Sequence, residues 1–121
     1  MTPALRPEAL EHLRQDVGTC AATEFAQCFL ALLYTRVEGL RRAVAAGDAN
    51  AAHVCVLSLH SSAIMVGAAA LAEHAAWLLA ALRTGLPARE VVYRISELTD
   101  QARTALLPEA RPHGSDGHTV R

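Results

Sequence analysis

The sequence predicts an all-α protein, an antiparallel up-down four-helix bundle with a short extra helix at its N-terminus. Alanine and leucine, which are strong helix formers, dominate the 121 residues, and only 4% of the residues are aromatic. Apolar residues recur at helical spacing in four long segments. Short turns join these segments, and short connections make consecutive helices antiparallel neighbours.

The first two helices are predicted from a proline, a threonine and the spacing of apolar residues. Pro7 suits the first turn of a helix over residues 7–17, which we expect to cover the bundle as a lid. Thr23 can cap a long second helix that runs to Ala46, because its hydroxyl can accept an unpaired amide hydrogen of the first turn. The side chains expected on the inner side of this helix are Phe25, Phe29, Leu32, Val37, Leu40 and Val44.

The central stretch, residues 47–82, is predicted to form two helices that meet at Gly67. Asp48 is a good N-cap for the third helix, because its carboxylate can accept first-turn amide hydrogens and suits the positive end of the helix dipole. Gly67 is expected to end that helix after Val66, since glycine adopts a positive φ without a Cβ penalty. A fourth helix is expected from Ala68 to Thr84, with Leu71, Ala75, Leu78 and Leu82 facing inward.

A fifth helix and a polar tail complete the chain. Pro87 suits the first turn of the fifth helix, and Pro108 follows its expected last residue, Leu107. Its inner residues are expected to be Val91, Ile95, Leu98, Ala102 and Ala105. The sequence therefore predicts one helical bundle domain over residues 1–107 and a disordered tail over residues 108–121.

Charge and composition argue against several classes of function. All 11 basic residues are arginines, 12 acidic residues balance them, and the formal net charge is -1 without any basic run. This pattern argues against nucleic acid or an anionic membrane as the partner. The N-terminal residues lack the apolar core of a signal peptide, and no apolar run reaches the ~18 residues of a membrane span. We therefore expect a cytoplasmic protein.

Neither a metal nor another cofactor is expected. Cys20, Cys28 and Cys55 show no C-x-x-C spacing, so we expect small buried hydrophobic residues rather than a zinc site or a disulfide framework. His53 and His60 would lie about 10 Å apart along a helix, too far to chelate one metal ion unaided. The chain also lacks a phosphate-loop or dinucleotide fingerprint.

Helical phase divides the third helix into a core side and an exposed side. The core side is predicted to carry Ala52, Cys55, Leu59, Ser62, Ala63 and Val66, flanked by Val56. The opposite side is predicted to carry His53, Leu57, His60, Ser61, Ile64 and, if the phase continues past Gly67, Ala68. An apolar stripe with two imidazoles suits the binding of a partner protein, so these six are the predicted partner-binding residues.

Residues around this stripe resemble the histidine-containing phosphotransfer (HPt) domain family. The family pattern is roughly Gly-Asp, eight residues, then His-x-Leu-Lys-Gly-Ser-Ala-x-x-Val-Gly-Ala-x-x-Leu-Ala. Without gaps, the matching positions are Gly47-Asp48, Leu59, Ser62-Ala63, Val66-Gly67-Ala68 and Leu71-Ala72, and residues 25–106 follow the family's order of helices and loops. The resemblance implies a four-helix bundle in which an exposed histidine passes a phosphoryl group between receiver domains of response regulators.

The same alignment puts Leu57 at the position of the family's phosphoaccepting histidine, with His60 at its lysine and Ser61 at its glycine. Leucine has no lone pair with which to attack a phosphoryl group, so no catalytic residue is expected at the family position. His53 and His60 would stand about 6 and 4.5 Å away along the helix axis. A misplacement near 1 Å already costs ~100-fold in rate.

Because Leu57 stands where the family has its histidine, the resemblance implies a pseudo-HPt adaptor. Such an adaptor binds a receiver or histidine-kinase domain without phosphotransfer at the family site. Such a protein is not an enzyme. Two alternatives stay open. One is an active phosphorelay carrier that uses His53 or His60, and the other is a helical protein that forms a homodimer through the stripe around Leu57.

Overall fold

The computed structural model describes residues 2–85 and 89–110, with side chains for residues 2–85 and 92–110. It confirms the predicted fold class, with a short N-terminal helix followed by four longer helices in an up-down bundle. Pro87, the side chain of Val91 and residues 111–121 of the predicted tail lie outside the described residues. The elements are α1 (Pro7–Val17), α2 (Thr19–Ala46), α3 (Ala49–Val66), α4 (Ala69–Ala81), α5 (Arg89–Leu106) and a 3₁₀ helix, η1 (Leu107–Ala110).

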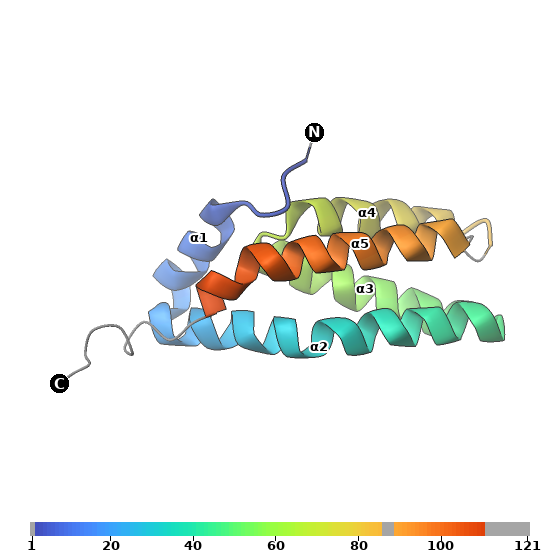
Figure 1. The fold of residues 1–121 in the computed structure, drawn as a ribbon, viewed down its shortest axis with the longest axis horizontal. Coiled ribbons are helices and arrows are strands. Elements are labelled where there is room, and N and C mark those ends of the chain that lie inside the picture. The colour runs from blue at the N-terminus through green and yellow to red at the C-terminus, as the bar shows by residue number, and fades with distance from the viewer. Residues whose placement is uncertain (1, 86–88, 111–121) are drawn as a thin grey trace.

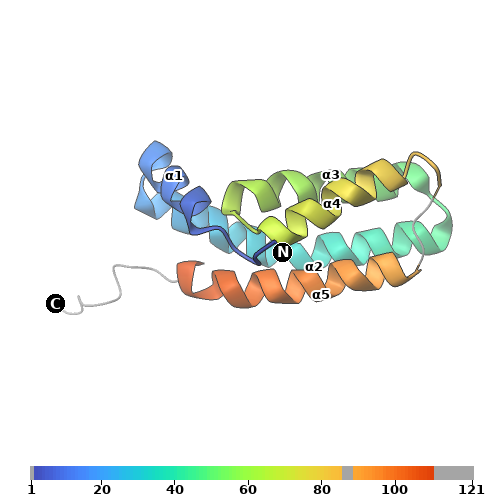
Figure 2. The same cartoon turned by 90° about the horizontal axis from the view of Figure 1, so that it is seen from above.

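The four longer helices lie alongside one another, and α1 lies at one end of them (Figure 1). α2 packs on α3 and α5, and α4 packs on the same two helices, so each long helix has two long neighbours (Figure 2). α1 packs on α2 and α3, which agrees with the predicted lid. The largest fully buried side chains include Leu10, Leu33, Leu40, Leu59, Leu71, Leu78, Ile95 and Leu106.

Two helix bounds differ by more than one residue from the predicted ones. α2 begins at Thr19 rather than after Thr23, because the turn that separates it from α1 lies at Gly18, whose φ is 94°. Thr23 is therefore inside the helix and only 8% exposed, so its predicted capping role is wrong. α4 ends at Ala81, and the next residues form a turn in which the Thr84 hydroxyl donates to the Ala81 carbonyl at 2.8 Å.

α3 begins and ends at the predicted residues. The Asp48 carboxylate accepts a hydrogen bond from the Ala51 amide at 3.0 Å, which confirms the N-cap. At the other end Gly67 has a φ of 81°, and the Ala68 amide donates to the Ala63 carbonyl at 2.9 Å. This is the Schellman arrangement, in which a left-handed glycine ends a helix and pairs its last carbonyl groups.

The residues before α1 pass over the turn between α3 and α4. The Arg6 amide donates to the Gly67 carbonyl at 2.7 Å, and the Ala70 amide, in the first turn of α4, donates to the Pro3 carbonyl at 2.9 Å. A Cβ atom on Gly67 would collide with the Arg6 carbonyl oxygen and lie 2.9 Å from the Cβ of Ala9. The missing side chain at Gly67 therefore lets the N-terminal segment lie against this turn.

Ordered structure continues beyond residue 107, where the tail was predicted to begin. The Gln27 side-chain amide donates to the carbonyl of Ala110 at 2.8 Å, and the Arg14 guanidinium lies 2.6 Å from the Glu109 carboxylate. The predicted disorder is therefore wrong for residues 108–110, because side chains of α1 and α2 hold η1 in place.

α3 is, by length and composition, apolar enough to cross a membrane, with a mean hydropathy of 1.3 over Ala49–Val66. The sequence prediction concerned uninterrupted apolar runs, whereas this property is a mean over a helix that also contains Asn50, two histidines and three serines. The core helix of a bundle passes the same test, and α3 packs between α2 and α4 with one side buried.

Candidate functional site

The outer side of α3 is an apolar surface. No charged residue occurs among the 18 residues of this helix. Val54, Leu57, Ile64 and Met65 are 62%, 46%, 53% and 47% exposed, and at 100° per residue they share one side of the helix with Ser61. We name these five residues the α3 face. Large apolar side chains gathered on one exposed side are typical of a docking surface.

Most of the predicted partner-binding residues lie on the α3 face or at its edge, but one does not. Leu57, Ser61 and Ile64 belong to the face, and His53 is exposed beside it. His60 is half-buried. Ala68 is fully buried, so its predicted place on the exposed stripe is wrong. The physical reason is the left-handed backbone of Gly67, which ends the helical phase one residue before Ala68.

α2 borders α3 along one edge. The Arg36 guanidinium donates to the Ser62 hydroxyl at 3.1 Å, and that hydroxyl donates to the Ser58 carbonyl at 2.6 Å. Leu32, one turn before Arg36 on the same side of α2, is 44% exposed. A cation and a further apolar side chain therefore stand near α3. Helical periodicity did not reveal these two residues, because it places Leu32 on the inner side of α2 and does not specify the helix contact that involves Arg36.

A groove of about 660 Å³ lies between α3 and α4. The first turns of α3 contribute Ala49, Asn50, His53 and Leu57, and the other side is formed by Ala76, Leu79, Ala80, Leu82 and Arg83. Leu57 therefore belongs both to the α3 face and to this groove. Helical phase within one helix does not predict this groove, because its two sides lie more than 15 residues apart along the chain.

This region carries an apolar residue at the position where the family resemblance implies a nucleophile. Leu57, at the position implied for a nucleophile, has only an apolar side chain. His53 and His60 are each displaced from it by about one helical turn. Within residues 2–85 and 89–110, no group of three or more His, Cys, Asp or Glu side chains is placed to hold a metal ion.

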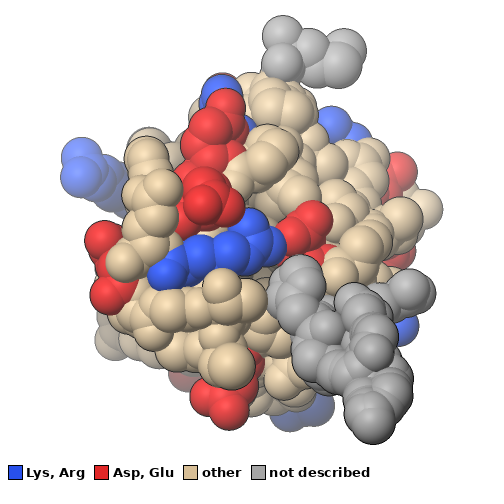
Figure 3. Space-filling view, turned by 90° about the vertical axis from the view of Figure 1, so that its left-hand side faces the viewer, with Lys and Arg blue, Asp and Glu red and all other residues tan. Residues whose placement is uncertain are grey.

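The end of the bundle near α1 has a different character. Figure 3 shows arginine and acidic side chains next to one another on this end. The Arg14 guanidinium pairs with both Glu11, at 3.3 Å, and Glu109, at 2.6 Å. Because positive and negative side chains pair here, this end of the bundle has no electrostatic field of one sign. α3, by contrast, has no charged residue.

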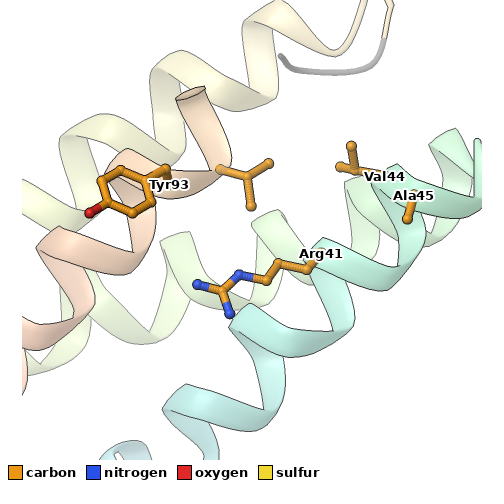
Figure 4. Close-up of a pocket in the computed structure, with 5 residues that line it drawn as sticks. Arg41, Val44, Ala45 and Tyr93 are labelled. Atoms are coloured by element: carbon orange, nitrogen blue, oxygen red, sulfur yellow. The ribbon is translucent and has the colours of Figure 1, made fainter. Parts of the chain in front are cut away.

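A second hollow lies between α2 and α5 (Figure 4). The Arg41 guanidinium at this hollow is already engaged, because it donates to the Ser96 hydroxyl at 2.6 Å and lies 3.5 Å from the Glu38 carboxylate. The hollow offers apolar contact and holds none of the predicted site residues. It is lined by Arg41, Val44, Ala45, Val92 and Tyr93 and has a volume of about 430 Å³.

Tyr34 and Cys55 have shifted pKa values, and each shift has a structural cause. The Tyr34 hydroxyl donates to the Asp100 carboxylate at 2.7 Å, and this hydrogen bond raises the pKa of Tyr34. Burial raises the pKa of the Cys55 thiol, which is half-buried. Cys20 and Cys28 are exposed, so the prediction that the cysteines are buried is wrong for these two. None of these groups lies on the α3 face.

No protein-family model, curated protein or solved structure matches the chain.

Proposed function

We propose that this chain is a pseudo-HPt adaptor. It docks through the α3 face onto a receiver or histidine-kinase domain of a two-component system and carries no phosphoryl group at the family position. It acts by occupying its partner, and such a partner would place it in the cytoplasm. The observation that carries the proposal is Leu57, a half-exposed leucine on the apolar α3 face of a four-helix bundle.

The ends of α3 support the alignment on which the proposal rests. The family pattern fixes the histidine position by counting forward from Gly-Asp and back from Val-Gly-Ala. Asp48 caps α3 and Gly67 ends it, so both counts begin at physical helix ends. A shift of register at Leu57 would need compensating insertions on both sides, and α3 is an uninterrupted helix of 18 residues.

The chemistry of the replaced residues supports docking without transfer. A phosphoryl group bound to a receiver aspartate needs a nucleophilic nitrogen in line with it, and leucine supplies none. Burying an exposed aliphatic side chain contributes about 1.5–3 kcal/mol when burial is complete. Several half-exposed apolar residues on one helix can therefore supply the central contacts of an interface.

The proposal is tested with purified receiver domains and histidine-kinase domains of the parent organism, each immobilised separately. The native protein should bind at least one of them, and Leu57→Glu should lose that binding. Leu107→Glu is the matched control, because Leu107 is 40% exposed, close to the 46% of Leu57, and lies in η1 rather than on α3. Failure of every domain to bind would overturn the proposal, as would equal binding by Leu57→Glu.

Phosphoryl transfer and self-association are separated from docking in the same system. After incubation with a phosphorylated receiver, the native protein should show no acid-labile, base-stable phosphohistidine. A phosphohistidine that disappears in His53→Gln or His60→Gln would identify an active phosphocarrier instead. Sedimentation of the native protein should show a monomer, whereas a dimer that Leu57→Glu dissociates would assign the α3 face to self-association.

A further inference from the structure

The groove between α3 and α4 is lined mostly by apolar side chains. Its walls carry Leu57 from α3 and Leu79 from α4. Ala76 and Ala80 are exposed and one helical turn apart, so they present a small-residue strip along α4. Small residues let another backbone approach closely, and the volume of about 660 Å³ leaves room for several side chains.

Arg83 gives this groove a positive charge. It lines the groove together with the polar residues Asn50 and His53, and no acidic side chain among the described residues lines it. Among the residues that the structure describes, the arginines in ion pairs are Arg14, Arg41, Arg42 and Arg94, so Arg83 is without a carboxylate partner there. Asp48 lies next to Ala49 in the sequence, but it is not among the lining residues and its carboxylate caps α3.

The shape of the groove favours a helix as its occupant. Two neighbouring antiparallel helices form a seam along their length, and a third helix packs into such a seam by fitting ridges into grooves. A β-strand of a partner would need a free strand edge for pairing, and residues 2–85 and 89–110 contain no strand.

We infer that the groove between α3 and α4 receives an amphipathic helix of a partner protein, with aliphatic side chains against Leu57 and Leu79 and a carboxylate beside Arg83. This inference rests on the proposed function only where it takes the partner to be a receiver or histidine-kinase domain. It adds the structural element through which the partner binds and the residue that sets its charge preference. Because Leu57 also belongs to the α3 face, one partner can cover the face and fill the groove.

The test is a selection from a displayed library of helical peptides against the full-length chain. Enriched peptides should carry aliphatic residues at helical spacing together with Asp or Glu. Arg83→Glu should weaken their binding about tenfold, the size expected when an ion pair becomes a like-charge pair. Arg42→Glu is the matched control, because it changes the net charge equally and Arg42, with 77% of its side chain exposed, lies on α2. A peptide whose acidic residue is exchanged for lysine should regain affinity for Arg83→Glu.

Several outcomes would overturn the inference. These are enrichment of peptides without acidic residues, equal binding by Arg83→Glu, no enrichment at all, or sedimentation of the chain with vesicles of anionic phosphatidylglycerol through Arg83. A dimer that Arg83→Glu dissociates would assign the groove to a second copy instead.

Circular dichroism and thermal unfolding confirm that each variant is folded, and Arg83→Gln replaces Arg83→Glu if Arg83→Glu does not fold. If a receiver domain binds in a way that depends on Leu57 but not on Arg83, this inference is wrong and the proposed function stands. If peptides bind in a way that depends on Arg83 but no receiver or kinase domain binds, the proposed function is wrong and this inference stands.

Discussion

Replacing Gly67 by alanine tests how the turn between α3 and α4 is built. A Cβ atom at this position, where φ is 81°, would collide with the Arg6 carbonyl oxygen and lie 2.9 Å from the Cβ of Ala9. Gly47 is a matched control, because it ends α2 with a φ of 71° and a Cβ there would meet nothing within 4 Å. The difference between the two alanine variants therefore isolates the collision with the N-terminal segment.

The size of the effect follows from the backbone geometry. Alanine with a positive φ costs about 1–2 kcal/mol at either glycine. At Gly67 the N-terminal segment must also move, which weakens the hydrogen bonds from the Arg6 amide to the Gly67 carbonyl and from the Ala70 amide to the Pro3 carbonyl. Each bond contributes about 1 kcal/mol. We expect the free energy of unfolding to fall by about 1–2 kcal/mol in Gly47→Ala and about 3–4 kcal/mol in Gly67→Ala.

Urea unfolding followed by circular dichroism measures both losses under one set of conditions. Hydrogen exchange at the Ala70 amide adds a local readout, because this amide should lose protection in Gly67→Ala and keep it in Gly47→Ala. Equal losses of stability in the two variants would refute the reasoning, since they would mean that nothing packs against Gly67.

Three further predictions concern other parts of the bundle. Asp48→Ala should lower the free energy of unfolding by about 1 kcal/mol, because alanine cannot accept the amide hydrogen that Asp48 accepts at the start of α3. Asp48→Asn should lower it less, because asparagine can also cap a helix, and equal losses of the two variants in urea unfolding would contradict this. In a chain whose other tyrosine is phenylalanine, Asp100→Ala should lower the pKa of Tyr34 in a tyrosinate absorbance titration. Since that pKa is raised by folding, the contribution of Tyr34 to stability is present below its unfolded pKa of about 10 and is lost as the pH rises through the folded value; an unchanged titration would contradict the cause. Burial should make Cys55 react with iodoacetamide more slowly than the two exposed cysteines, as followed by mass spectrometry of the labelled peptides, and equal rates would contradict its raised pKa.

The sequence was sufficient where local chemistry decides the structure. The bounds of α3 follow from a capping carboxylate at Asp48 and a positive φ at Gly67, and both groups act on their own neighbours in the chain. Periodicity likewise placed Phe29, Val37 and Leu40 in the core. It assigned Leu32 to the core as well, yet Leu33 takes that place, because adjacent helical residues point about 100° apart and Leu33 is the one in phase with Phe29, Val37 and Leu40.

The candidate site was predicted only in part. Leu57 and Ile64 follow from helical phase within one helix, and both are exposed as predicted. Arg36, Arg83 and the groove depend on how α2 and α4 pack against α3, which periodicity within a single helix does not specify. Gly67 was correctly predicted to end α3, and the wrong prediction that Ala68 is exposed has the same cause. A glycine that ends a helix also ends its helical phase, so Ala68 does not follow the phase of α3.

Isothermal titration calorimetry of a bound receiver or histidine-kinase domain with the native protein and with Leu57→Glu tests the central claim most directly. We expect a measurable affinity for the native protein and a loss of at least about tenfold for Leu57→Glu, because a carboxylate would replace an apolar contact on the α3 face. The matched control Leu107→Glu should bind as the native protein does. Unchanged affinity in Leu57→Glu, or a native protein that binds no such domain, would contradict the account.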